Sequence, residues 1–247
     1  MSFLSVEHLT CRFGGIVALQ DVSFTMEKGE ILGLMGANGA GKTTLLSLIA
    51  GNVRPSSGHI LLEGERIEGR SPHRVNRLGV SRTFQIVRPF SGLTVLENVM
   101  VGALYGRGQT MSQRVARAQC LDILNEVGLA DRRDSPASAL TLSGRKRLEV
   151  ARALATQPRL LLLDEVLAGL NASEANDALD LIRRLRESRM LSIVVIEHIM
   201  KALMRLSHRI LVLHDGRKIM DGTPEQVASD PRVIAAYLGE DHDVSPS

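Results

Sequence analysis

The amino-acid sequence predicts an α/β fold, and three observations support that prediction. In the second half of the chain, apolar strands alternate with helical stretches, a pattern typical of parallel strands joined by crossover helices. Residues 3–35 alternate between apolar and polar side chains and carry glycine turn signals, which indicates short strands. A glycine-rich loop lies between a predicted strand at 30–35 and a predicted helix at 42–50. With 247 residues, the chain is long enough to bury the core of such a fold.

The remaining elements follow from hydrophobic periodicity and from turn residues. Further strands are predicted at 60–62, 65–67, 80–84, 160–163, 191–196 and 209–213. Helices are predicted at 95–101, 111–127, 145–155, 173–188 and 199–206. The strand at 160–163 is apolar on both faces, as expected inside a parallel sheet. Ser173 is the expected N-cap of its helix, and residues 129–140 are expected to form a polar loop.

The glycine-rich loop fits the phosphate-binding pattern G-x-x-x-x-G-K-[ST] through Gly36, Gly41, Lys42 and Thr43. Glycines let backbone N–H groups turn inward around a polyphosphate, and the helix N-terminus adds positive potential. Lys42 can reach the β- and γ-phosphates, and the Thr43 hydroxyl can ligate Mg²⁺. The competing interpretation is a glycine-rich turn before an ordinary helix. The predicted nucleotide contacts are Gly36, Asn38, Gly39, Ala40, Gly41, Lys42, Thr43 and Thr44. The pattern therefore predicts that the chain binds a nucleoside triphosphate.

Two acids end the apolar strand at 160–165, and such a position meets the ligand crevice of a parallel sheet. Asp164 is expected to hold Mg²⁺, and Glu165 is expected to polarise the attacking water. A solvent-exposed acidic strand end is the alternative. His198 follows a buried strand in the same way, although a lone histidine is more often structural. Gln85 would not be selected from the residues alone.

Composition and charge limit the possible functions. The net charge of +3 is small and the charges of both signs are interspersed, which argues against nucleic-acid binding. Cys11 and Cys120 are isolated, so we expect reduced packing residues in a cytosolic protein. The N-terminus lacks the pattern of a signal peptide, and no apolar run approaches the ~18 residues of a membrane span. A membrane role would therefore require a partner.

Together these motifs resemble the nucleotide-binding subunit of ATP-binding cassette (ABC) transporters. The order is the phosphate loop, Gln85, a helical insertion, the acids at 160–165, the segment 168–171 and His198. The resemblance implies a P-loop NTPase (RecA-like) core with an antiparallel β layer and a helical subdomain. It also implies that Gln85 ligates Mg²⁺ and senses a membrane partner, and that His198 contacts the γ-phosphate. Phe13, near Val17, takes the place of the aromatic that stacks on adenine; a core phenylalanine is the rival interpretation.

A closer similarity exists to the ATPases of branched-chain (hydrophobic) amino-acid importers, carried by residues 165–171, 196–200, 222–226 and 236–240. It implies ATP and Mg²⁺ as ligands, integral membrane permeases, a second ABC ATPase subunit and a periplasmic binding protein as partners. It places the chain in the cytoplasm, on the inner face of the membrane through the permeases. Urea and short-amide importers share much of the pattern. A lipid exporter ATPase, a soluble ABC ATPase of translation or DNA repair, and a soluble phosphotransferase are the other candidates.

The resemblance divides the chain into a core at 1–86 and 157–238, a helical subdomain at 87–156 and a polar tail at 239–247. The chain departs from the family at the signature Leu-Ser-Gly-Gly-Gln, where residues 140–144 read Leu-Thr-Leu-Ser-Gly. A gapless alignment, preferred over one with a deletion, keeps a hydroxyl at Thr141 and replaces both glycines by Leu142 and Ser143. Thr141 and Ser143 are the expected contacts to the partner's nucleotide. Weak trans-activation and a heterodimer, rather than a homodimer, are therefore expected.

Overall fold

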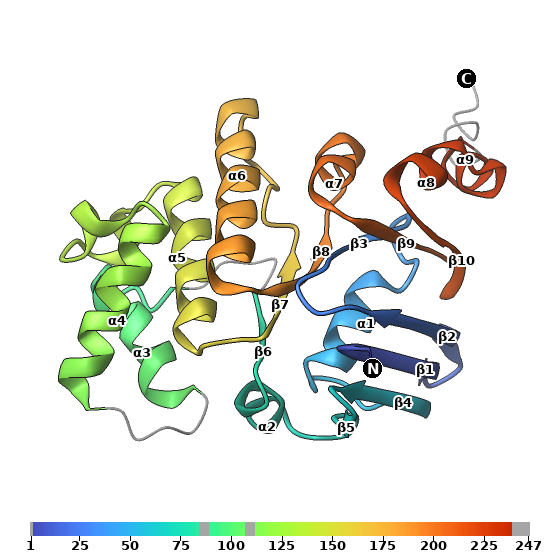
Figure 1. Cartoon of the computed structure of the whole chain (residues 1–247), viewed down its shortest axis with the longest axis horizontal. Coiled ribbons are helices and arrows are strands. Elements are labelled where there is room, and N and C mark those ends of the chain that lie inside the picture. Colours follow the sequence, from blue (N-terminus) through green and yellow to red (C-terminus); the bar gives the residue numbers. More distant parts are fainter. Residues whose placement is uncertain (1, 84–88, 107–111, 239–247) are drawn as a thin grey trace. The chain divides into compact units, whose positions relative to one another are not determined.

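The computed structural model describes residues 2–83, 89–106 and 112–238. The chain divides into two compact units, Met1–Ser71 with Val194–Ser247, and Pro72–Ile193. Both units mix strands and helices, so the predicted α/β class is confirmed (Figure 1). The predicted division into a core and a helical subdomain at residues 87 and 156 stays a prediction. Within the described residues, no helix combines the length and apolar character needed to cross a membrane.

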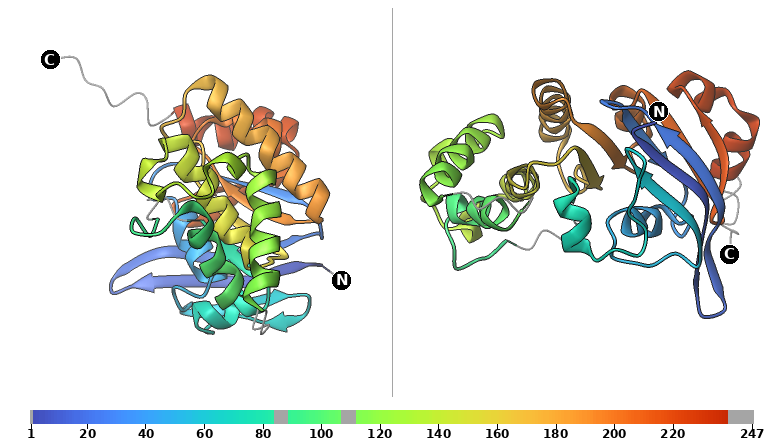
Figure 2. Two further views of the ribbon diagram at one scale, coloured as in Figure 1. Left: turned by 90° about the vertical axis from the view of Figure 1, so that its left-hand side faces the viewer. Right: turned by 60° about the horizontal axis from the view of Figure 1, so that its bottom comes forward.

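The first unit contains an antiparallel sheet with the strand order β2-β1-β4-β5. Its strands are β1 (Leu4–Phe13), β2 (Ile16–Met26), β4 (Ser57–Leu62) and β5 (Glu65–Arg66). Strands β1 and β2 alternate buried and exposed residues along much of their length, as a sheet covered on one face requires. The β1–β2 hairpin extends beyond the other strands of this sheet in both views of Figure 2.

A second group of strands in this unit is β3 (Ile31–Met35), β9 (Arg209–His214) and β10 (Arg217–Gly222). Strand β9 pairs in parallel with β3 and antiparallel with β10, so the sheet is mixed. All five residues of β3 are buried, which agrees with its continuous apolar sequence. The helices of the unit are α1 (Lys42–Ile49), α7 (Met200–Leu206), α8 (Pro224–Ser229) and α9 (Pro231–Leu238).

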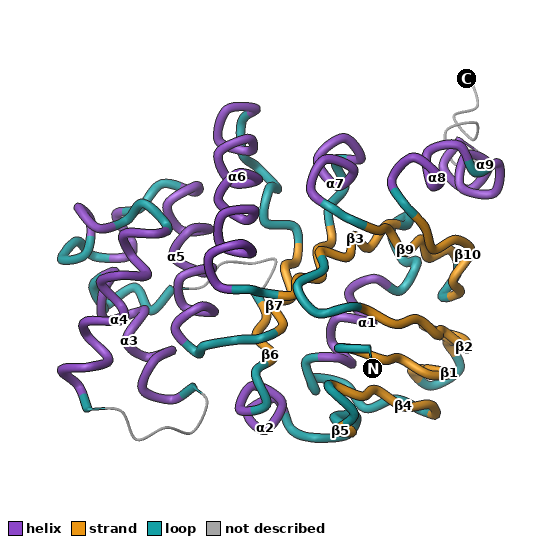
Figure 3. The backbone as a smooth tube through the Cα atoms, viewed as in Figure 1, coloured by secondary structure: helices purple, strands orange, loops and turns teal. Residues whose placement is uncertain are grey.

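The second unit is mainly helical and carries two parallel strands. The helices are α2 (Pro72–Arg77), α3 (Val95–Tyr105), α4 (Gln113–Glu126), α5 (Leu142–Ala155) and α6 (Ala172–Arg189). Helix α3 packs against α4 and α5, and Figure 3 shows these three as neighbouring helices. Strand β6 (Val80–Arg82) pairs with β7 (Leu160–Asp164). The division between the units falls within β8 (Ser192–Ile196). Two short 3₁₀ turns, Ala130–Arg132 and Ala137–Ala139, interrupt the predicted loop at 129–140.

The N-cap prediction for α6 is wrong. The helix begins at Ala172, and Asn171 rather than Ser173 is its cap. The Asn171 side chain accepts from the backbone N–H of Glu174 (3.0 Å), whose carboxylate accepts from the backbone N–H of Asn171 (3.1 Å). This reciprocal capping box satisfies two N–H groups that Ser173 could not satisfy together. The sequence prediction also omitted α2, α8, α9 and β10.

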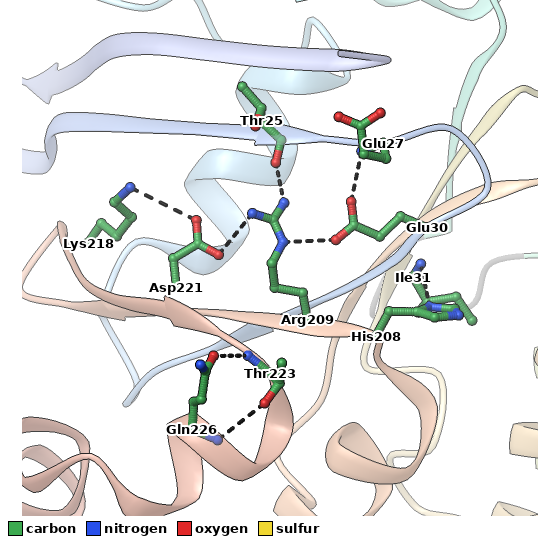
Figure 4. Close-up of polar contacts among 10 residues, drawn as sticks. All are labelled: Thr25, Glu27, Glu30, Ile31, His208, Arg209, Lys218, Asp221, Thr223 and Gln226. Carbon is green, nitrogen blue, oxygen red and sulfur yellow. Dashed lines mark hydrogen bonds and ion pairs between the residues drawn. The ribbon is translucent and has the colours of Figure 1, made fainter. Parts of the chain in front are cut away.

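A half-buried charge cluster lies at the start of β3 and β9 (Figure 4). Arg209 donates from Nε to Oε1 of Glu30 (2.8 Å) and forms an ion pair with Asp221 (3.1 Å). Its guanidinium also donates to the backbone carbonyl of Thr25 at the end of β2. Burial raises the pKa of Asp221, and the charge of Arg209 opposes that shift. The cluster therefore joins β2, β9 and β10 of the first unit through a single guanidinium.

Candidate functional site

The glycine-rich loop between β3 and α1 has no room for side chains at two positions. Gly36 has a φ of +155°, and a Cβ atom built on it would lie 2.4 Å from the carbonyl oxygen of Leu213 in β9. A Cβ atom on Gly41, at a φ of +98°, would lie 2.6 Å from the carbonyl oxygen of Ala18 in β2. Only glycine tolerates both the backbone conformation and the close approach. The two glycines thus let the loop run directly against β9 and β2.

Lys42, the first residue of α1, directs its ammonium group into this loop. Its Nζ donates to the carbonyl oxygens of Gly36 (2.6 Å) and Ala37 (2.8 Å), and the residue is 6% exposed. The N-terminus of α1 has Gly41 as its cap residue, no side-chain cap and no acidic residue in its first turn. The helix dipole and the ammonium group therefore both favour an anion at this loop.

The rest of the predicted loop contacts differ in exposure. The residues that reach the surface fully or in part are Asn38, Gly39, Thr43 and Thr44. Ala40 is buried, and its carbonyl oxygen accepts from the backbone N–H of Gly216 (3.3 Å), in the turn between β9 and β10. The Gly216 carbonyl in turn accepts from Gln20 in β2 (2.8 Å). The β9–β10 turn therefore supports the loop through the backbone of its buried residue Ala40.

Phe13 lies at the end of β1 and pairs with Ile16 across the β1–β2 turn. It is 49% exposed, so the rival prediction that Phe13 is a core residue is wrong. Val17 is half-buried and pairs with Arg12. One residue further along β2, Ala18 contacts the position of Gly41. An aromatic ring is thus exposed on the hairpin that also borders the phosphate loop.

Asp164, the last residue of β7, is 2% exposed. Its Oδ2 accepts from Nη2 of Arg82 at the end of β6 (2.7 Å). Its backbone N–H donates to the hydroxyl of Thr83 (3.2 Å), which follows Arg82 directly. The carboxylate is therefore held by a buried cation and by a fixed backbone.

The other carboxylate oxygen of Asp164, Oδ1, is a candidate ligand for a metal ion. Oδ1 is buried and has no hydrogen-bond partner among the residues that the structure describes. A buried acceptor without a partner costs about 1–3 kcal/mol. A carboxylate oxygen is a preferred ligand of Mg²⁺, which would satisfy this atom. The arrangement therefore fits a magnesium ion at Asp164.

Glu165 follows Asp164 and is 9% exposed. Its backbone has a φ of +52°, a left-handed conformation that is uncommon for a residue with a Cβ. Its carbonyl oxygen accepts from the backbone N–H of Ala168 (3.2 Å) and from Nζ of Lys146 in α5 (2.8 Å). The backbone of Glu165 is thus fixed by two donors.

His198 and Gln85 are the two remaining predicted site residues, and only His198 lies among the described residues. His198 lies in the first unit between β8 and α7, and it is exposed. Gln85 lies outside the described residues. The residues that it follows, Arg82 and Thr83, are the ones that contact Asp164 in the second unit.

Helix α5 begins at the altered signature. Thr141 is its N-cap, and its hydroxyl accepts from the backbone N–H of Gly144 (3.2 Å). Ser143 lies half-buried in the first turn. Leu142 is 47% exposed, and its Cδ2 lies 2.9 Å from the position that a Cβ atom on Gly169 would occupy. Leu142, which replaces a glycine of the family signature, therefore covers the side of the α5 N-terminus that faces Gly169.

Sequence reasoning missed three residues that support the site, Arg82, Thr83 and Lys146. Only Lys146 gave a usable signal, because it precedes the buried Val150 and Ala153 by four and seven residues in α5. A cation on the buried face of a helix indicates an internal acceptor. Arg82 and Thr83 carried no comparable signal, since their partner Asp164 is distant in the sequence.

Two family models match the chain. The model described as "ABC transporter" matches residues 19–168, which is more than half of the chain. The model described as "Branched-chain amino acid ATP-binding cassette transporter" matches residues 217–243. The first match contains the phosphate loop, the signature region and the acids that end β7.

Similar proteins span nearly the whole chain. The "High-affinity branched-chain amino acid transport ATP-binding protein LivG" of Escherichia coli (strain K12) is 42% identical over 249 residues, which cover 96% of this chain and 98% of that protein. The protein BraF of Pseudomonas aeruginosa, with the same description, is 41% identical over the same shares. The solved structure of MJ1267, an ATP-binding cassette of an ABC transporter in its ADP conformation, superimposes with a TM-score of 0.89 at 28% identity and covers 97% of this chain and 99% of that chain.

Proposed function

The chain belongs to the ABC transporter family of ATP-binding proteins, and from this we propose that it binds and hydrolyses ATP for an importer of branched-chain or other hydrophobic amino acids. The similarity to LivG of Escherichia coli over 96% of the chain carries this proposal. The match of residues 217–243 to a branched-chain amino-acid transporter model supports the same substrate class.

The phosphate loop supplies the ATP-binding part of the proposal. Lys42 and the backbone N–H groups of residues 36–44 bind the β- and γ-phosphates, because glycine permits the loop conformation and the first turn of α1 carries no competing acid. Phe13 stacks on the adenine ring, and Val17 contacts it. The exposed ring of Phe13 supports this role, since a buried ring could not meet a nucleotide.

Magnesium is the second ligand that we propose, and Asp164, Thr43 and Gln85 would hold it. The buried Oδ1 of Asp164, with no partner among the described residues, supports this assignment. The ion would supply positive charge to the transferring phosphoryl group. Within the chain, Arg82 holds the other carboxylate oxygen of Asp164 and so fixes the orientation of the ligand.

Glu165 is the proposed general base, and His198 the proposed contact to the γ-phosphate. Glu165→Gln keeps the shape of the side chain and removes its basic oxygen, so ATP should bind but persist unhydrolysed. The test is the fraction of bound ATP that remains after a chase with unlabelled nucleotide. Normal hydrolysis by this variant would exclude Glu165 as the base.

The proposed partners are membrane permeases, a second ABC ATPase subunit and a periplasmic binding protein. Permeases would place the chain at the cytoplasmic face of the membrane. A heterodimer is favoured because Leu142 occupies a position where the family signature has glycine, and its side chain is exposed. Substituting the catalytic acid of each subunit separately tests the asymmetry. Equal loss of transport in both cases would contradict it.

The substrate class is tested by uptake. Cells that lack the gene, complemented with the wild-type chain, should regain uptake of labelled leucine, isoleucine and valine, and Glu165→Gln should not restore it. Uptake of labelled urea or acetamide under the same conditions would instead support the urea or short-amide importer. If the chain restores uptake of neither the amino acids nor urea or acetamide, and its ATPase activity is intact, a lipid exporter or a soluble phosphotransferase would be favoured.

A further inference from the structure

Lys146, in the second turn of α5, is buried and donates a hydrogen bond from Nζ to the carbonyl oxygen of Glu165 (2.8 Å). Lysine is rarely buried unless its ammonium group has an acceptor. This acceptor belongs to the backbone of the proposed base, so the contact acts on the position of Glu165. We propose that Lys146 is a positioning residue that links the start of α5 to Glu165. The inference rests on the proposed function, because it takes Glu165 as the base.

The conformation of Glu165 explains why a charged donor matters there. Its φ of +52° is unfavourable for a residue with a Cβ and persists only where the surroundings fix it. The turn contact from Ala168, at 3.2 Å, is a neutral hydrogen bond, whereas the contact from Lys146 is shorter and charge-assisted. Without the ammonium group, the backbone of Glu165 loses its stronger donor. Its carboxylate then samples positions that are less suited to activating water.

The same part of α5 also packs on the segment that follows Glu165. Leu142, in the first turn, contacts the position of Gly169, whose φ is +78°. A small cavity between α5, residues 166–170 and α6 is lined by Lys146, Arg147, Val166 and Leu170, among others. A displacement of the first turns of α5 would therefore reach residues 165–170 through polar and apolar contacts together.

This connection gives the altered signature a second role. In the proposed dimer, residues 140–144 face the nucleotide of the partner subunit. Lys146 joins that region to the chain's own base within one helix. Closure of the dimer on the partner's nucleotide would thus be sensed at Glu165, even if residues 140–144 activate the partner weakly.

The test uses the full chain assembled with its permeases and the second ATPase subunit, in which the partner's own catalytic acid is substituted. Lys146→Met keeps an unbranched side chain of similar length and removes the donor, and Lys146→Arg keeps a charged donor. Arg147→Met is the matched control, because Arg147 lies on the same helix and lines the same cavity, but its guanidinium contacts the Val127 carbonyl (3.3 Å) and Asp177 (3.9 Å) and not Glu165. Each variant is measured for kcat, for the Kd of a fluorescent ATP analogue and for thermal unfolding.

We expect Lys146→Met to lower kcat at least about tenfold and to change Kd less than about twofold, since a misplaced base loses part of its catalytic contribution. Lys146→Arg should recover most of kcat, and Arg147→Met should leave it unchanged. On a Glu165→Gln background, Lys146→Met should cause no additional loss, because residues that act as a unit are not additive. If Lys146→Met does not fold, Lys146→Leu, which also removes the donor, is compared with Arg147→Met by the same criteria.

Two results would overturn the inference. One is a wild-type kcat for Lys146→Met, and the other is an equal loss of kcat for Lys146→Met and Arg147→Met. Either result counts against Lys146 only if Glu165→Gln abolishes hydrolysis. Hydrolysis by Glu165→Gln would instead contradict the proposed function, so the two failures are distinguishable.

Discussion

The carbonyl oxygen of Ala18 lies 2.6 Å from the position of a Cβ atom on Gly41, at a φ of +98°. Gly41→Ala should therefore displace the phosphate loop from β2 and weaken ATP binding at least about tenfold, a loss of about 1.4 kcal/mol. Gly64→Ala is the matched control, because Gly64 has a φ of +82° but nothing within 4 Å of its Cβ position. Titration with a fluorescent ATP analogue measures both variants. Equal losses of affinity would mean that a general loss of stability, and not the contact with Ala18, decides the result.

Leu142 offers a direct test of the altered signature. We expect Leu142→Ala to increase ATP turnover at the partner's site several-fold, because it uncovers backbone N–H groups at the start of α5 without the helix penalty of glycine. Leu142→Ile, which keeps the bulk, should leave turnover unchanged. Turnover is measured with Glu165 substituted by glutamine, so that only the partner's site reports. No gain from Leu142→Ala would show that bulk at this position is not limiting.

Arg209 should contribute more to stability than an exposed arginine with a similar ion pair. Arg209→Met leaves the largely buried carboxylates of Glu30 and Asp221 without their cation, and we expect a loss of about 2 kcal/mol in the free energy of unfolding. Arg70→Met removes a more exposed pair with Glu65 (2.7 Å) and should cost less than about 1 kcal/mol. Denaturant titration of both variants makes the comparison. A similar cost for the two would indicate that burial of the cluster adds nothing.

The buried cysteines should be chemically inert in the folded protein. Burial raises the pKa of Cys120 to about 11 and also raises the pKa of Cys11. At pH 8 the reactive thiolate of Cys120 is on the order of 10⁻³ of the total. We expect a disulfide reagent to label neither cysteine until the protein is unfolded. Rapid labelling of the native protein would contradict this prediction.

The same shift sets a pH dependence of stability. The folded protein holds the Cys120 proton more tightly than the unfolded chain, whose pKa is near 9.0. The stabilising contribution is therefore complete below pH 9 and is lost as the pH rises towards 11. Unfolding free energies measured across this range should fall more steeply for the wild type than for Cys120→Ala.

Local sequence rules predicted the parts of the site that are local. The phosphate loop and the acids that end β7 follow from a strand, a short motif and a neighbouring helix, and these were found in the expected places. The predicted cap of α6 was wrong. Ser173 and Asn171 are both good N-cap residues, and the reciprocal hydrogen bonds between Asn171 and Glu174 decide between them. Helix α5 begins three residues before the prediction because Thr141 caps it.

Contacts between distant segments could not be predicted in this way. Arg82 meets Asp164 only because β6 pairs in parallel with β7, and no pattern within 80–84 reveals that register. The support that Gly216 gives to Ala40 likewise depends on the pairing of β3 with β9. Phe13 is exposed at the end of β1, where it pairs with Ile16 next to the β1–β2 turn.

The cap of α5 has a consequence for the energetics of association. The Thr141 hydroxyl accepts from Gly144 through a lone pair and retains one hydrogen that it can donate. A phosphate oxygen could accept that hydrogen without displacing the cap, so the two contacts would coexist. Thr141→Ala would remove both, and Thr141→Ser would keep both. The first turn of α5 is thus preorganised, and binding the partner's nucleotide would carry little entropic cost for ordering it.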